Sequence, residues 1–133
     1  MQGNKKIHGI RSQNYRMQIT KVVKNLLPDA EIVDPDITDP HRLSYTKEQS
    51  VEMFFKYCDL AGQADLLISY IPEASMGSAV EMWQAYKSDV PVLTISEMDY
   101  NWVVKLLSTR IYPNIESFKK SFNKSLLEEL KFI

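Results

Sequence analysis

The sequence lacks the features that stabilise small secreted domains or anchor proteins in membranes. Its only cysteine is Cys58, so no internal disulfide can form, which favours a reducing, intracellular compartment. No apolar run approaches the roughly 20 residues of a membrane-spanning helix. The N-terminal residues lack the apolar core of a signal peptide. We therefore expect a cytoplasmic protein with no membrane partner.

Neither sign of charge dominates, because 16 Lys and Arg residues stand against 17 Asp and Glu residues. This balance argues against binding a nucleic-acid polymer by bulk electrostatics, although a small anion needs only one local site. His8 and His41 are isolated and lack the spacing of metal ligands, so we expect no metal and no cofactor. Without repeats or linkers, residues 1–133 fit a single domain.

Strand-like and helix-like patterns alternate along the chain. Five extended segments are expected, at Lys6–Ile10, Glu31–Val33, Leu66–Ile68, Val90–Ile95 and Thr109–Tyr112. The segments between these strands, and the segment after the last one, have apolar residues at helical spacing. In the last segment this spacing predicts a closing helix over Ile115–Leu130. This alternation predicts an α/β three-layer sandwich with a parallel sheet of about five strands in the order 2-1-3-4-5.

The segment Ala64–Tyr86 is the centre of this expected fold. An unbroken apolar run marks a buried strand, Pro72 ends it, and the small residues Ala74–Ser78 lead into an amphipathic helix. Ligands of open parallel sheets bind beyond the carboxyl ends of the strands. We therefore expect a site between this loop and the facing loop Gly9–Ser12, with Glu81 in the first turn of the helix.

Several residues in these loops suit a ligand, although each also has an ordinary structural interpretation. Ser75 and Gly77 belong to a loop whose small side chains leave room for a ligand. Tyr70, at the end of the strand, could stack on a base. Glu81 could instead complete a capping box with Ser78 on a solvated helix face.

The chain resembles the nucleoside 2-deoxyribosyltransferase superfamily, which includes nucleoside 5'-monophosphate N-glycosidases. The resemblance covers roughly the central half of the chain. It lies in Ala64–Ile68, Ser75–Met82, Ala85-Tyr86 and Pro91-Val92, and more weakly in Gly9–Arg11 and Asn101–Val104.

The resemblance implies a flavodoxin-like fold, assembled as a homodimer or larger homo-oligomer, that acts on a nucleoside or nucleotide. Glu81 would be the nucleophile that attacks the anomeric carbon to form a covalent glycosyl-enzyme, which water or a second base would resolve. Asn101 would contribute to the pocket of a neighbouring subunit.

A serine six residues before the nucleophile is typical of the monophosphate hydrolases, and Ser75 stands there. Gly9, Arg11 and Ser12 follow the first expected strand, where that branch holds the 5'-phosphate, and the Arg and Ser side chains suit phosphate oxygens. The sequence therefore favours a hydrolase of nucleoside 5'-monophosphates over a deoxyribosyltransferase.

The chain departs from the family pattern in the first expected strand, which lacks the family's usual tyrosine and has His8 near that place, and at residue 57. Tyr57 stands where the family carries an aspartate that assists departure of the base, and Asp59 lies two residues away. This departure leaves open a non-catalytic nucleotide-binding sensor as a further alternative.

Overall fold

Three short parallel strands form the sheet at the centre of the protein. The computed structural model describes residues 9–33 and 42–132, and for residues 9–14 and 42 it describes the backbone alone. Within these residues the strands are β1 (Leu67–Tyr70), β2 (Val92–Ile95) and β3 (Arg110–Tyr112). They pair in the order β1-β2-β3, with Leu67 opposite Val92 and Leu93 opposite Arg110.

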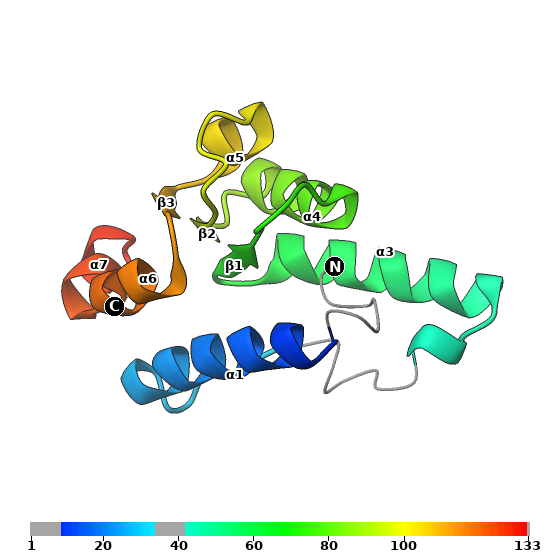
Figure 1. The fold of residues 1–133 in the computed structure, drawn as a ribbon, viewed down its shortest axis with the longest axis horizontal. Coiled ribbons are helices and arrows are strands. Elements are labelled where there is room, and N and C mark those ends of the chain that lie inside the picture. Colours follow the sequence, from blue (N-terminus) through cyan, green and yellow to red (C-terminus); the bar gives the residue numbers. More distant parts are fainter. Residues whose placement is uncertain (1–8, 34–41, 133) are drawn as a thin grey trace.

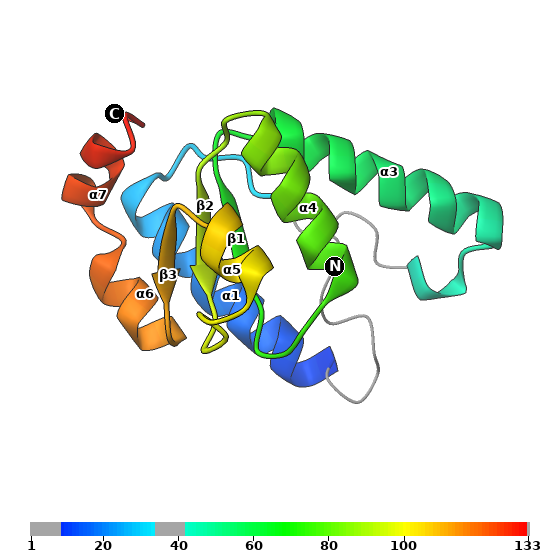
Figure 2. The same cartoon turned by 90° about the horizontal axis from the view of Figure 1, so that it is seen from above.

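Helices cover both faces of this sheet (Figure 1). The α-helices are α1 (Gly9–Leu26), α3 (Lys47–Gln63), α4 (Met76–Lys87), α5 (Trp102–Leu107), α6 (Ile115–Ser121) and α7 (Lys124–Glu129), and a 3₁₀ turn, η2, spans Arg42–Ser44. Figures 1 and 2 place α4 and α5 over one face, with α1, α6 and α7 over the other. Helix α3 packs beside α4 at the β1 side of the sheet.

The central strand β2 supplies both hydrophobic cores. Its four side chains are all buried and alternate between the two faces of the sheet. Val92 joins Met82, Ala85 and other residues under α4 and α5. On the opposite face the buried core is built around Leu93 and Ile95, together with side chains from α1, α6 and α7.

The expected five-strand flavodoxin-like sheet is wrong, because the described residues form three strands and six α-helices. Glu31–Val33 does not join the sheet: Glu31 and Val33 are exposed, so Ile32 is its main contribution to the core. One buried side chain offsets little of the entropy lost in fixing a strand. The α/β class and the parallel succession of the last three strands are confirmed.

The N-terminal strand expected at Lys6–Ile10 is not found in the part of it that the structure describes. Gly9 and Ile10 begin α1, while residues 6–8 lie outside the described residues. No glycine or proline interrupts the chain from Ile10 to Leu26, so a helix can run through the whole segment until Pro28. Within the described sheet, β1 is therefore an edge strand rather than an inner one.

Local capping residues decide the boundaries of two helices. The sequence Thr46-Lys47-Glu48-Gln49 has the spacing of a capping box, and the structure confirms it: Thr46 Oγ1 accepts from the Gln49 N–H, and the Gln49 side chain accepts from the Thr46 N–H. The single C-terminal helix expected over Ile115–Leu130 is divided in two. Asn123 caps α7 by accepting from the Leu126 N–H at 2.9 Å, which ends the continuous helix at α6.

Candidate active site in the cleft beside strand β1

A cleft of about 810 Å³ lies between α1, the following segment to Val33, the C-terminal half of α3 and strand β1. Polar and aromatic side chains from four elements line it, among them Arg16, Tyr57, Ser69, Tyr70, Ser78 and Glu81. Its volume lies within the usual range of sites for small organic ligands. The cleft therefore has the size and the functional groups to hold a nucleotide-sized molecule.

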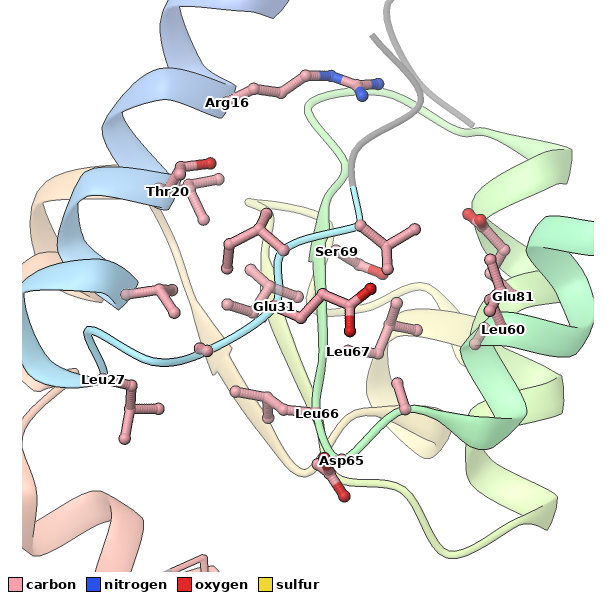
Figure 3. Close-up of a pocket in the computed structure, with 18 of the residues that line it drawn as sticks. Arg16, Thr20, Leu27, Glu31, Leu60, Asp65, Leu66, Leu67, Ser69 and Glu81 are labelled. Atoms are coloured by element: carbon pink, nitrogen blue, oxygen red, sulfur yellow. The ribbon is translucent and has the colours of Figure 1, made fainter. Parts of the chain in front are cut away.

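Glu81 reaches this cleft because of where α4 begins. Ser75 is the N-cap, and its Oγ accepts from the Ser78 N–H at 3.3 Å. Glu81 therefore lies in the second turn of α4, not in the expected first turn, and the capping box considered for Ser78 and Glu81 is wrong. Met82 and Ala85 turn towards the sheet. Glu81 is half-buried on the adjacent flank of the helix, and Figure 3 shows its carboxylate directed into the cleft.

Helix α3 brings Tyr57 and Cys58 to the same flank of α4. Tyr57 is 3% exposed and lines the cleft together with Glu81. Burial, then the negative charges of Glu81 and Asp59, raise the pKa of the Cys58 thiol. The Glu81 carboxylate and the C-terminal half of α3 therefore border the same cleft.

Asp59 occupies a different position from Tyr57. Its side chain is exposed and is not among the residues that line the cleft. Tyr57 and Asp59 are the two residues considered for assisting departure of the base. Of these, Tyr57 is the one that lines the cleft with Glu81.

Arg16 is a site residue that the sequence reasoning missed. Figure 3 shows its guanidinium at one end of the cleft, Asp65 at the other end, and Glu81 on the flank across from α1. It follows the same helical spacing as the core residues Ile19 and Val23 of α1. A charged residue in line with an apolar stripe was the signal that could have identified it.

The aromatic ring of Tyr70 is already packed against another ring. Tyr15 from α1 lies with its ring centroid 4.1 Å from that of Tyr70, at an interplanar angle of 40°. Both rings line the cleft, and Arg16 lies over Tyr15 at 5.8 Å from the ring centroid. A base that stacks here would meet an aromatic pair rather than an isolated Tyr70.

Three of the expected binding residues do not line the cleft. Ser75 caps α4, Gly77 lies in the first turn of α4, and Asn101 is the N-cap of α5. The Asn101 Oδ1 accepts from the Val103 N–H at 2.9 Å and from the Val104 N–H at 3.4 Å.

The remaining expected residues, Gly9, Arg11 and Ser12, form the first turn of α1, and their side chains lie outside what the structure describes. This turn and the beginning of α4 both lie at the end of the molecule where β1 terminates (Figure 2). The backbone arrangement therefore puts these positions at the carboxyl edge of the sheet.

Among the described residues, no group of three or more His, Cys, Asp or Glu side chains could hold a metal ion. No helix in those ranges is long and apolar enough to cross a membrane.

Comparison of the chain with protein-family models, with curated proteins and with solved structures finds no significant match. The resemblance drawn from the residues around Glu81 therefore stays a prediction.

The environment of Cys58 predicts a loss of stability in alkali. The folded protein keeps the thiol proton above the ordinary pKa of 9.0, whereas the unfolded chain loses it near that pH. Below about pH 9 the buried thiol therefore makes its full contribution to the free energy of unfolding. That free energy falls by up to about 1.4 kcal/mol per pH unit as the pH rises towards the pKa of Cys58 in the folded protein. Urea unfolding between about pH 8 and pH 10 should show this slope.

The decrease of the free energy of unfolding with pH should be smaller in Cys58→Ala than in the wild type. It should be intermediate in Glu81→Gln, which removes one of the negative charges near Cys58. Burial also raises the pKa of Tyr112, from 10.0, so that its contribution begins at higher pH. A slope below pH 10 that is the same in wild type and Cys58→Ala would contradict the assignment.

Proposed function

We propose that this protein hydrolyses the N-glycosidic bond of a nucleoside 5'-monophosphate. The observation that carries the proposal is that Glu81 and Tyr57 line one cleft beside β1. A carboxylate that shares a cleft with a buried phenol suits a reaction in which one group attacks a sugar carbon and another gives a proton to the leaving base. The residues around Glu81, from Ser75 to Met82, supply the resemblance to enzymes with this chemistry.

In the proposed first step, a Glu81 oxygen forms a bond to the anomeric carbon while the bond from that carbon to the base nitrogen breaks. The base leaves with the electron pair and takes a proton from the Tyr57 hydroxyl. The transition state resembles an oxocarbenium ion, which a nearby carboxylate stabilises. Water then cleaves the glycosyl ester, which releases the sugar phosphate, restores the Glu81 carboxylate and returns a proton to Tyr57.

The substrate phosphate is proposed to lie at the end of the cleft that Arg16 crosses. Arg16 supplies a guanidinium there, a group that binds phosphate oxygens in a fork geometry. Arg11 and Ser12, in the first turn of α1, and Ser75, at the start of α4, are proposed to assist from the carboxyl edge of the sheet. Ser75 can donate its hydroxyl hydrogen while its oxygen accepts from Ser78.

Two alternatives use the same cleft. A deoxyribosyltransferase would pass the sugar from Glu81 to a second base instead of water. A nucleotide sensor would bind the monophosphate without turnover. Tyr57 in place of the family's aspartate favours this second alternative, because a phenol is a weaker acid than a carboxylic acid. The enzyme is proposed to act in the cytoplasm as a homodimer or larger homo-oligomer, in which Asn101 completes a neighbouring site.

Replacement of the nucleophile should abolish turnover. Incubation of the wild type with ribo- and deoxyribonucleoside 5'-monophosphates, with and without an acceptor base, should release free base without acceptor, as measured by chromatography. Glu81→Gln should lower this rate at least about a thousandfold, because the amide is a poor nucleophile, while nucleotide binding stays measurable by calorimetry.

Glu73→Gln is the matched control, because Glu73 is exposed and does not line the cleft. Unchanged turnover in Glu81→Gln would refute the nucleophile assignment. Base exchange that requires an acceptor would identify a transferase. Binding without any base release from the whole panel would favour the sensor.

The proton donor can be assigned by comparing two variants. Tyr57→Phe removes only the hydroxyl from a buried side chain and should lower kcat by about 10²–10⁴-fold, with the largest effect on the base that leaves least readily. Asp59→Asn should retain the wild-type rate, because Asp59 is exposed and off the cleft. The opposite result, loss of kcat in Asp59→Asn alone, would transfer the role of the acid to Asp59.

The phosphate site can be tested through substrate selectivity. Arg16→Ala should raise KM for a nucleoside monophosphate by roughly 10–100-fold, the effect of losing a charge-assisted hydrogen bond. The KM of the corresponding unphosphorylated nucleoside should change little. Equal changes for both substrates would show that Arg16 shapes the cleft without binding phosphate.

A further inference from the structure

A second glutamate enters the cleft from a different part of the chain than Glu81. Glu31 belongs to the segment that follows α1, and it is one of the residues that line the cleft. Figure 3 shows its carboxylate directed into the cleft, between the end at Arg16 and the end at Asp65. The proposed hydrolysis gives Glu31 no role, although an acidic side chain in such a position must affect which molecules the cleft accepts.

The backbone on both sides of Glu31 is anchored. On the N-terminal side, the Lys24 ammonium donates to the carbonyl oxygens of Pro28 and Ala30. On the C-terminal side, the Ile32 side chain packs against the hydrophobic core under α1 and α6. These contacts limit the positions that the Glu31 carboxylate can reach, which is a condition for a side chain that discriminates between ligands.

The substrate proposed above would lie along the cleft in a defined order. Its phosphate binds at Arg16 and its anomeric carbon lies at Glu81, so the base extends onward from there, away from Arg16. In Figure 3 the Glu31 carboxylate lies farther from Arg16 than the Glu81 carboxylate does, and it comes from the other side of the cleft. Glu31 therefore lies where the edge of the base is expected.

The chemistry of a carboxylate restricts the bases that it can bind. An ionised carboxylate accepts hydrogen bonds and donates none. Guanine carries two neighbouring donors on its Watson–Crick edge, the ring N1–H and the 2-amino group, and these match the two carboxylate oxygens. Adenine and cytosine have an acceptor nitrogen beside their amino group, and uracil and thymine have a carbonyl on each side of a single N–H. Each of these four bases would therefore bring an acceptor against a negatively charged oxygen.

We propose that Glu31 selects guanine by accepting hydrogen bonds from its N1–H and its 2-amino group. The inference rests on the proposed binding of a nucleoside 5'-monophosphate in the cleft, and it narrows that substrate to a guanine nucleotide. Asp65 and Glu81 line the same cleft, and their negative charges also favour a base that presents donors. Glu31 is a specificity residue in this scheme and takes no part in bond cleavage.

The preference can be measured by calorimetry on the full chain, with the 5'-monophosphates of guanosine, inosine, adenosine and cytidine and their 2'-deoxy forms. The wild type should bind the guanine nucleotide roughly 10–100-fold more tightly than the adenine nucleotide, the discrimination expected of one bidentate pair. The inosine nucleotide should fall between them, because its base keeps the N1–H but lacks the 2-amino group. Free-base release from the same panel should follow the same order.

Glu31→Gln changes one carboxylate oxygen into a donor and leaves the size of the side chain almost unchanged. This variant should lose most of the preference for guanine and should bind the adenine nucleotide more tightly than the wild type does. The amide can accept from the adenine amino group and donate to the neighbouring ring nitrogen. Its affinity for ribose 5-phosphate, which has no base, should equal that of the wild type.

Asp65→Asn is the matched control, because Asp65 is also an exposed carboxylate that lines the cleft but lies at its far end. This variant should keep the preference for guanine. Circular dichroism should show the same fold for both variants. The proposal would be overturned by a preference that persists in Glu31→Gln, or by one that disappears in Asp65→Asn instead.

The same measurements separate this inference from the proposed function. Base release at similar rates from all the nucleotides would refute the role of Glu31 and leave the hydrolase standing. Binding that prefers guanine and depends on Glu31, without base release from any nucleotide, would refute the hydrolase and keep the role of Glu31. A wild type that binds none of the nucleotides would overturn both.

Discussion

The close packing of α3 against α4 is the contact on which the candidate site depends. Gly62 lies at this contact, where a Cβ would be 3.1 Å from the Ser88 Oγ and 3.5 Å from the Gln84 carbonyl oxygen. Across the same pair of helices, Tyr57 of α3 and Glu81 of α4 line one cleft. Alanine at position 62 would need only a small shift of the Ser88 hydroxyl, whereas a long side chain there would press on the backbone of α4.

The sheet holds this helix pair in place through its central strand. Val92 packs beneath Met82 and Ala85, which fixes the rotation of α4 about its axis. Because Met82 and Ala85 are buried, Glu81 must project to the side, into the cleft rather than into bulk solvent. The direction of the proposed nucleophile thus follows from two buried apolar side chains that come after it in the same helix.

The sequence predicted best where local signals and tertiary packing agree. The buried run before Pro72, the capping residues of α3, and the parallel strands after Ala64 were all recognisable. The N-terminal part failed because short apolar runs such as Glu31–Val33 do not reveal whether a neighbouring strand exists to pair with. The start of α4 was misplaced because both Ser75 and Ser78 are good N-cap residues, and only the fold selects Ser75.

Helix α4 shows why one twelve-residue segment can serve three surfaces without conflict. Successive residues are rotated by about 100°, so Val80, Glu81 and Met82 point in three directions although they are adjacent in sequence. Met82 enters the core, Glu81 lines the cleft, and Val80 lies on the outer side of the helix. A change of side chain at Met82 would therefore alter the packing that orients Glu81, whereas a change at Val80 would leave the cleft as it is.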